Sequence, residues 1–323
     1  MERRFGDALF CRSFSGKAGR LHEQHDAGKI RAFMNPTFSI ITPSFRQPDW
    51  LKLCAASIAD QEGVTLEHIV QDAGTGPELE AWAATQPGLR LCVEKDKGMY
   101  DAVNRGLRKS SGEILSYLNC DEQYLPGALA SVAEFFAAHP DVDVVFGDVV
   151  VVDENAGYLC SRPVILPQLH HTQVCTLGVF TAATFFRRSV LEKHDLYFSD
   201  AWRDVGDAAW VLELIRRGIK MAVLRRFTTS FADTGENMNM KPNAVAEQVR
   251  LRESAPRWVQ ALAPLWVAHF RLRRLFAGIY RPTRFTYSIY TSESGGRRRE
   301  FPVEKPTFIW RGRFVKREIP VTA

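Results

Sequence analysis

The strongest constraint in this sequence is a repeated alternation of short apolar segments with segments of helical periodicity, beginning at residue 38. The apolar segments span residues 38–45, 66–72, 89–96, 113–122 and 141–148. They are apolar along their length rather than at every second position, which is typical of strands buried on both faces of a mostly parallel sheet. The helical segments between them, such as residues 48–61, would cover that sheet. The sequence therefore predicts an α/β fold.

Polar residues gather where these predicted strands end. Carboxylates stand at four of the five ends, at Asp72, Asp96, Asp121–Glu122 and Asp148, and the first strand ends in Thr42–Phe45. Ligands of open α/β sheets bind outside the carboxyl ends of the strands. Helix capping would account for one or two of these acids. Their shared edge indicates a binding site for a cation or for polar hydroxyl groups.

The segment "TPSFRQPDW" after the first predicted strand contains no glycine. It lacks both GxGxxG and GxxxxGK[ST], which argues against a dinucleotide-binding domain and against a P-loop ATPase. If the ligand bears phosphates, a divalent cation held by carboxylates is one way to neutralise them.

Residues 38–235 resemble the inverting family 2 glycosyltransferases of the GT-A fold, which has a Rossmann-like, mostly parallel central sheet. The resemblance rests on "SIITPSFRQ", "EHIVQDAGT", "EKDKGMYDAVNRGL", "SGEILSYLNCDEQYLPGAL", "VDVVFGD" and "ATFFRRSVLEKH". Each motif is weak alone, but they occur in the order and spacing of the family. The resemblance implies an enzyme that transfers a sugar, of the hexosyltransferase type, from a nucleotide-diphosphate sugar to a hydroxyl group.

The resemblance also implies which residues bind the donor. Asp72 matches the acid that binds the nucleotide base, although an Asx turn before Gly74 is the alternative. The other implied donor residues are Thr42, Ser44, Asp96, Asp101, Asn104 and Asn119. Asp101 could instead be a first-turn acid favoured by the helix dipole.

The segment "NCDE" matches the family's DxD motif, with Asn119 in place of the first acid. The resemblance implies that Asp121 binds a divalent cation, Mg²⁺ or Mn²⁺, with Glu122 as a second candidate ligand. Mg²⁺ often uses only one or two protein carboxylates together with phosphate oxygens, so a single Asp is sufficient. The alternative is that both acids cap the helix that restarts at Pro126.

An inverting transfer needs a base for the acceptor hydroxyl, and the resemblance places this base in "WRDVGDAAWVLELIRRG". Asp207 lies three residues before Trp210 and is the preferred candidate, with Asp204 as the alternative. Either residue could instead cap the helix. Further on, Asp233, Glu236 and Asn237 are weaker candidates to help hold the metal, and His170–His171 suit a polar loop or an acceptor contact better than a metal site.

Three regions follow from these patterns: a loosely ordered leader at residues 1–35, a GT-A domain at 36–240 and a basic C-terminal extension at 241–323. In the extension, a Trp- and Arg-rich helical stretch suits either an interfacial membrane helix or packing against the catalytic domain. A hairpin is predicted around residues 294–296, and its Arg297–Arg299 run could meet lipid phosphates or water. No nucleic-acid partner is expected, because the predicted catalytic edge is acidic.

The predicted location is cytoplasmic, with peripheral attachment to the cytoplasmic membrane face as an option. The sequence has six cysteines without zinc-site spacing, and no apolar stretch long enough for a spanning helix or a secretory signal. The predicted function is sugar transfer to a glycan or lipid-linked acceptor. The alternatives are a nucleotidyltransferase, which usually has a Gly-rich basic loop after the first strand, and a catalytically inactive scaffold of the same fold.

Overall fold

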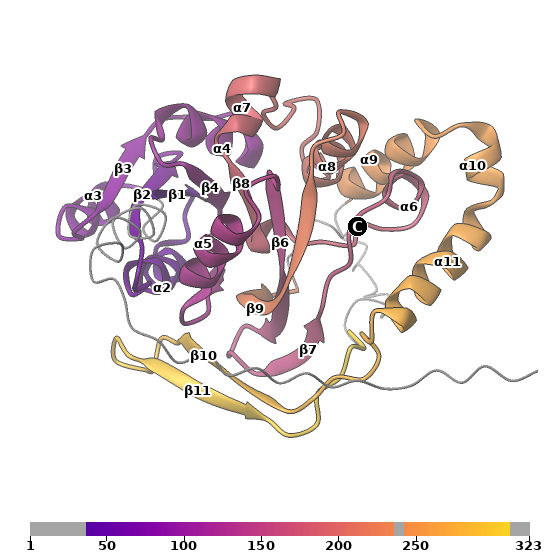
Figure 1. The fold of residues 1–323 in the computed structure, drawn as a ribbon. Helices are drawn as coiled ribbons and strands as arrows, with labels where there is room; N and C mark the ends of the chain where they lie inside the picture. The colour runs from indigo at the N-terminus through magenta and orange to yellow at the C-terminus, as the bar shows by residue number, and fades with distance from the viewer. Residues whose placement is uncertain (1–36, 236–241, 311–323) are drawn as a thin grey trace, which may run out of the picture.

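The computed structural model describes residues 37–235 and 242–310, and Figure 1 shows how their helices and strands are arranged. The central sheet has nine strands in the order β3-β2-β1-β4-β8-β6-β9-β5, with β7 paired to β6. Its parallel half consists of β1 (Thr37–Ser44), β2 (Thr65–Asp72), β3 (Leu89–Val93) and β4 (Ile114–Tyr117). The other strands are β5 (Glu122–Tyr124), β6 (Val144–Asp153), β7 (Tyr158–Arg162), β8 (Thr184–Arg187) and β9 (Met221–Asp233).

This topology confirms the α/β fold predicted from the sequence. The first four strands pair in parallel: β2 lies between β1 and β3, and the chain then crosses to place β4 on the other side of β1. β6 and β9 also pair in parallel, whereas β5, β7 and β8 run antiparallel to their neighbours and make the sheet mixed.

One predicted strand end is wrong. The fifth strand was expected to stop at Asp148, but β6 continues to Asp153, because the apolar run Val149–Val152 prolongs it into the core. Asp148 therefore lies in mid-strand. Its Oδ1 accepts a hydrogen bond from the backbone N of Val164 (2.8 Å) and is paired with Arg225 (3.2 Å), so it is a structural carboxylate.

Helices cover both faces of the sheet. The helices up to residue 216 are α2 (Pro48–Ala59), α3 (Pro77–Ala83), α4 (Met99–Lys109), α5 (Ala128–Ala138), α6 (Leu169–Val174), α7 (Ser189–His194) and α8 (Gly206–Arg216), with a 3₁₀ turn η1 at Thr181–Ala183. The sheet has a hydrophobic core on each face, and the side chains of neighbouring residues in a strand pack into different cores, since they point to opposite faces. Ile41 packs with Val103 of α4 and Val211 of α8, while Ile40 packs with the cluster of α2 and α5.

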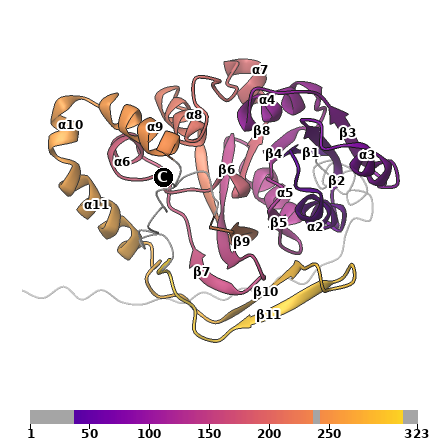
Figure 2. The ribbon, with the colours of Figure 1, turned by 180° about the vertical axis from the view of Figure 1, so that it is seen from behind.

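The C-terminal part forms two separate features at the rim of the molecule (Figures 1 and 2). Helices α9 (Pro242–Glu253), α10 (Arg257–Ala261) and α11 (Ala263–Phe276) extend from the side on which α6 and α8 lie. The predicted hairpin is confirmed as β10 (Phe285–Tyr290) and β11 (Arg298–Val303), which pair antiparallel. No helix within the described ranges is long and apolar enough to cross a membrane.

The arginines of the hairpin do not form one free basic run. Arg298 is largely buried and forms a bidentate ion pair with Asp60 after α2, at 2.5 and 2.7 Å. It also donates to the carbonyl oxygens of Tyr124 and Ser288. Arg298 therefore holds the hairpin against α2 and β5 and is not available to lipid phosphates.

Candidate active site

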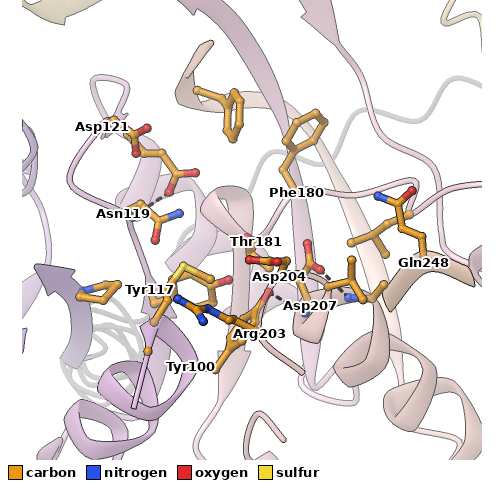
Figure 3. Close-up of a pocket in the computed structure, with 18 of the residues that line it drawn as sticks. Tyr100, Tyr117, Asn119, Asp121, Phe180, Thr181, Arg203, Asp204, Asp207 and Gln248 are labelled. Atoms are coloured by element: carbon orange, nitrogen blue, oxygen red, sulfur yellow. Dashed lines mark hydrogen bonds between the residues drawn. The ribbon is translucent and has the colours of Figure 1, made fainter. Parts of the chain in front are cut away.

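A large cavity of about 1220 Å³ opens at the carboxyl ends of β1 and β4. It is bounded by the loop after β1, the start of α4, the acidic turn after β4, α6, the start of α8 and α9. Figure 3 shows Asn119 and Asp121 on one side of it, Phe180 and Gln248 on the other, and Asp204 and Asp207 between them. The cavity therefore lies at the sheet edge where the sequence places its site.

The acidic turn after β4 gives its two acids different roles. Glu122 is fully buried, and its Oε2 accepts a hydrogen bond from the backbone N of Asn119 (2.8 Å), while Glu122 N donates to Asn119 O (3.1 Å). This exchange closes the turn. Asp121 lines the cavity and receives no hydrogen bond from another described residue. Glu122 lines the cavity as well, so a ligand could use either acid, and Asp121 has the carboxylate that is less engaged by the described residues.

The adjacent carboxylates of Asp121 and Glu122 would place two negative charges close together when both are ionised. Burial raises the pKa of Asp121 to about 6. Burial also raises the pKa of Glu122, and the charge of Asp121 raises it further. A hard divalent cation prefers oxygen ligands and would offset this charge. No group of three or more His, Cys, Asp or Glu within the described ranges could hold a metal alone. The turn therefore fits a cation that shares its coordination with phosphate oxygens and water.

The start of α8 places Asp207 at the cavity. Its backbone N donates to the Tyr100 hydroxyl (3.0 Å), and its Oδ1 accepts from the backbone N of Ala208 (2.7 Å). Gly206 permits this approach, because a Cβ there would lie 2.5 Å from the Tyr100 ring. Burial raises the pKa of Asp207 to about 6, outweighing the hydrogen bonds that lower it. A carboxylate with this pKa is suited to general base catalysis near neutral pH.

Asp204, the alternative base, also lines the cavity but is held by the protein. Its Oδ2 accepts a hydrogen bond from Asn243 Nδ2 of α9 (2.6 Å). Both candidates thus face the same space, and each carboxylate is hydrogen-bonded by one side chain, Asp204 by Asn243 and Asp207 by Tyr100.

Glu247 of α9 is a residue that the sequence did not indicate. Its carboxylate accepts hydrogen bonds from the backbone N atoms of Arg203 (2.8 Å), Asp204 (2.9 Å) and Val205 (3.0 Å). Burial raises its pKa, but these donors outweigh burial and lower it overall. Glu247 therefore holds the loop that leads into α8 and so fixes the position of Asp207. Its only signal in the sequence is a carboxylate on a helix beyond the family resemblance.

Three of the predicted donor residues line the cavity: Ser44, Asp96 and Asn119. Each lies at or just beyond the end of a parallel strand, at β1, β3 and β4. Asp96 Oδ1 accepts a hydrogen bond from the backbone N of Gly98 (2.9 Å), which shapes the turn into α4.

Three other predicted donor residues are engaged inside the protein. Thr42 Oγ1 is hydrogen-bonded to His68 Nε2 (2.9 Å) in the buried layer beneath the cavity. Asn104 exchanges two hydrogen bonds with the backbone of Phe198 (2.7 and 3.0 Å). Asp101 accepts from the backbone N of Lys97 (3.0 Å) and pairs with Arg105 (3.0 Å). None of the three lines the cavity.

Asp72 forms the Asx turn that the sequence offered as an alternative. Its Oδ2 accepts from the backbone N of Gly74 (2.9 Å) and Thr75 (2.6 Å), and its Oδ1 accepts from Thr75 Oγ1 (2.6 Å). A carboxylate can accept about four hydrogen bonds, so Oδ1 retains room for one more donor. The neighbouring Ala73, rather than Asp72, lines the cavity.

The remaining candidates within the described ranges are engaged by other side chains of the protein. His171 is hydrogen-bonded to His269 Nδ1 of α11 (3.1 Å), and the ring of His170 packs on Trp266. Burial, aided by nearby positive charge, lowers the pKa of His171 to about 4. Asp233 accepts a hydrogen bond from Trp310 Nε1 (2.6 Å). Glu236, Asn237 and the predicted leader at residues 1–35 lie outside the described ranges.

The sequence is similar to known glycosyltransferases. The family model described as glycosyl transferase family 2 matches residues 39–194. A PGL/p-HBAD biosynthesis glycosyltransferase of Mycobacterium bovis (strain BCG / Pasteur 1173P2) is 36% identical over 126 residues, which are 37% of this chain and 49% of that protein. The chain thus spans about half the length of this relative. An uncharacterized glycosyltransferase of Mycobacterium tuberculosis (strain ATCC 25618 / H37Rv) is 29% identical over 224 residues, 67% of this chain and 82% of that protein.

Solved structures agree on the fold. The crystal structure of residues 1–349 of S. aureus TarS in complex with UDP-GlcNAc has a TM-score of 0.53 and 17% sequence identity, and covers 74% of this chain and 73% of that chain. The longer crystal structure of S. aureus TarS has a TM-score of 0.52 and 16% identity, covering 82% of this chain and 60% of that chain. At this level of identity the likeness concerns the fold, and it supports the GT-A arrangement of the sheet.

Proposed function

The chain contains a glycosyl transferase family 2 domain, and we propose that it moves a hexose, with inversion, from a nucleotide-diphosphate sugar to a hydroxyl group of a glycan or lipid-linked acceptor. The observation that supports this most is the placement of Asp121 and Asp207 on one cavity at the carboxyl ends of the parallel strands. A cation-binding acid and a base with a pKa of about 6 are the two groups that such a transfer needs.

The proposed reaction uses Asp207 as the general base. Its carboxylate accepts the proton of the acceptor hydroxyl while that oxygen forms a bond to the anomeric carbon. The bond from this carbon to the diphosphate oxygen breaks on the opposite face, and its electron pair leaves with the diphosphate. Tyr100 and Glu247 position the start of α8, and with it Asp207. Alignment of this kind supplies much of the rate enhancement in such reactions.

In this proposal Asp121 holds a divalent cation, Mg²⁺ or Mn²⁺, with Glu122 as a second candidate ligand. When bound, the cation would neutralise negative charge on the leaving diphosphate. Ser44, Asp96 and Asn119 would contact the donor directly, since they line the cavity. Asp72 would reach the base of the nucleotide through its remaining acceptor position at Oδ1. Thr42, Asp101 and Asn104 would support the donor site from behind through the contacts that fix β1 and α4.

A thermal-shift screen tests the donor class. UDP, GDP, dTDP and their sugars would be added with and without Mn²⁺, and at least one pair should stabilise the full chain only when metal is present. UDP and UDP-GlcNAc are the first probes, because a protein of similar fold binds UDP-GlcNAc. The proposal would be wrong if no nucleotide stabilised the protein with any divalent cation.

The pH dependence of transfer tests the role of Asp207. Only the ionised carboxylate can accept a proton, and burial raises its pKa to about 6. We therefore expect kcat/KM to be level above pH 7 and to fall about tenfold per pH unit below an apparent pKa near 6. The measurement is an initial-rate profile at saturating metal. A profile that stays level down to about pH 4.5 would contradict a base with this pKa.

We also propose that α10 and α11 bind an anionic membrane surface, where a lipid-linked acceptor would be found. Trp266 and Phe270 of α11 face the protein and pack on the rings of His170 and His171. Other side chains of α10–α11 are apolar and exposed, with Leu265 63% and Phe276 86% accessible; the others are Trp258, whose ring also meets His170 edge-on, and Leu262, Leu272 and Leu275. We call these six residues the apolar face of α10–α11.

The charges around this face favour anionic lipid. Residues 254–292 contain no Asp or Glu, and Arg257 and Arg271 are exposed beside the face. Residues 241–323 contain 17 of the 42 Lys and Arg residues but only 6 of the 37 Asp and Glu residues. A helix with exposed Leu, Phe and Trp beside Arg is typical of interfacial binding. α6 lies between α11 and the cavity, so a bound membrane would lie near the acceptor side.

Vesicle flotation checks this surface. The full chain should float with phosphatidylcholine vesicles that contain about 30% phosphatidylglycerol, and much less with phosphatidylcholine alone. The double variant Leu272→Glu/Phe276→Glu should bind at least about tenfold more weakly, since it loses two large apolar side chains. Val93→Glu, at an exposed valine far from this face, is the matched control and should float like the wild type. Equal flotation of the double variant and the wild type would rule out this surface.

A further inference from the structure

One part of the cavity lining is aromatic, and it begins beside the acidic turn, because Phe231 is the strand partner of Glu122. Phe180, Phe231 and Trp310 all line it and touch one another. The rings of Phe180 and Trp310 are stacked at 6.4 Å, Phe231 meets Trp310 edge-on at 5.8 Å, and Phe180 meets Phe231 edge-on at 5.6 Å. We call these three residues the aromatic wall. Figure 3 shows Phe180 across the cavity from Asn119 and Asp121.

Trp310 reaches the cavity from far along the chain, and it is fixed there. The segment before it lies on β7, where Thr307 O accepts hydrogen bonds from Ser161 N (2.8 Å) and Tyr158 OH (3.0 Å). The indole Nε1 donates to Asp233 Oδ2 (2.6 Å), which sets the orientation of the ring. A buried Trp usually has a hydrogen-bond partner of this kind. The C-terminal extension therefore contributes one aromatic ring to the cavity lining.

The aromatic wall lies close to the proposed base. Thr181 follows Phe180 directly and also lines the cavity, and its hydroxyl is hydrogen-bonded to Tyr117. Burial, and then the negative charge of Asp207, raises the pKa of Tyr117, so Asp207 lies within electrostatic reach of that phenol. A ring resting on Phe180 would thus have its hydroxyl groups directed to the part of the cavity that contains Asp207 and Thr181.

We propose that the aromatic wall is the acceptor subsite and that it binds the apolar face of a pyranose ring of the acceptor. A pyranose ring has C–H groups on its faces and hydroxyl groups around its edge. Aromatic side chains pack against the C–H groups of a ring face. Polar groups that converge on the same space form hydrogen bonds to the hydroxyl groups and so orient the ring. Phe231 adjoins the acidic turn, which suits the donor diphosphate and its cation, whereas Phe180 lies across the cavity from Asp121, which leaves the Phe180 end of the aromatic wall for the acceptor. The inference rests on the proposed sugar transfer and names the class of acceptor.

Saturation-transfer NMR with the full chain tests the subsite without knowledge of the natural acceptor. The probes are methyl β-D-glucopyranoside, methyl β-D-galactopyranoside and methyl α-D-mannopyranoside, with phenol as a ring that lacks sugar hydroxyl groups. At least one glycoside should receive saturation at the protons of one ring face. Trp310→Ala and Phe180→Ala should each weaken its binding about two- to tenfold, as expected for the loss of one stacked ring. Trp310→Phe should retain most of it.

Phe308→Ala is the matched control. Phe308 belongs to the same segment as Trp310 but packs on Tyr280, outside the cavity, so its removal should leave glycoside binding unchanged. UDP binding in the presence of Mn²⁺ is measured in parallel and should be equal in all variants, which shows that they are folded. The proposed subsite is contradicted if no glycoside binds the wild type or if phenol binds as well as every glycoside. It is also contradicted if Phe308→Ala binds the glycoside as weakly as Trp310→Ala does. If glycosides bind as expected but no nucleotide does, the proposed donor class is wrong instead.

Discussion

Asp207→Asn is expected to lower kcat about a thousandfold while leaving donor binding intact. Asparagine keeps the size of the side chain and can still accept the hydrogen bond from Ala208 N, but it cannot take a proton from the acceptor. General base catalysis typically contributes about 10²- to 10⁴-fold. The measurement is single-turnover transfer at saturating donor, with the dissociation constant of the nucleoside diphosphate determined separately.

The same substitution should make the protein more stable, which separates loss of catalysis from loss of the fold. Burial raises the pKa of Asp207 from 3.8 to about 6, so the folded state is destabilised when this carboxyl ionises. The cost develops as the pH rises from about 4 to 6 and is complete above it, where it is on the order of 2–3 kcal/mol. Asp207→Asn should therefore raise the free energy of unfolding by about this amount at pH 8, and by less as the pH falls towards 4.

Asp204→Asn is the matched control, because Asp204 faces the same cavity and is already hydrogen-bonded to Asn243. It should retain at least about a third of wild-type kcat, since it removes no proton acceptor that the reaction uses. If Asp207→Asn is active and Asp204→Asn is not, the base is Asp204.

The sequence predicted which side chains reach the cavity where the end of a strand decides the position of a side chain. Ser44, Asp96 and Asn119 stand at or after the last residue of a strand, and parallel strands end at one edge. Thr42 points the same way as Ser44 but lies one pleat deeper, where His68 covers it. Asp101 and Asn104 share a helix with the site, but their spacing does not show which neighbour each one meets.

The contacts that the sequence could not show are those made over long separations. Glu247 holds the loop at residues 203–205 across more than forty residues, and Trp310 reaches Asp233 across 77. No pattern in the neighbouring sequence predicts either contact, because a carboxylate or an indole on a helix or loop can face solvent as readily as a partner residue. Arg298 likewise stands in a run of three arginines, yet only the fold shows that it pairs with Asp60 while its neighbours stay at the surface. The C-terminal extension thus became informative only when its position was known.

Asp121→Ala is expected to abolish metal-dependent donor binding and to lower turnover at least about a hundredfold. Its carboxylate receives no hydrogen bond from another described residue, so the substitution removes charge without leaving a buried donor unpaired. In the wild type, a nucleoside diphosphate at about 100 times its dissociation constant with Mn²⁺ should add roughly 2.7 kcal/mol to the free energy of unfolding. In Asp121→Ala the melting temperature should be the same with and without Mn²⁺.

Glu122→Gln is the control for that result and also decides which acid of the turn binds the cation. The Glu122 side chain accepts the hydrogen bond from Asn119 N that closes the turn, and glutamine can accept it equally well. If Asp121 is the ligand, Glu122→Gln should keep its metal-dependent stabilisation and most of its turnover. If Glu122→Gln loses both while Asp121→Ala keeps them, the cation is held by Glu122, and the turn serves chiefly to bring that buried carboxylate to the diphosphate. If neither variant changes the response to Mn²⁺, the acidic turn is not a metal site, and the leaving diphosphate must be stabilised by cationic side chains of the cavity such as Lys97 and Arg203.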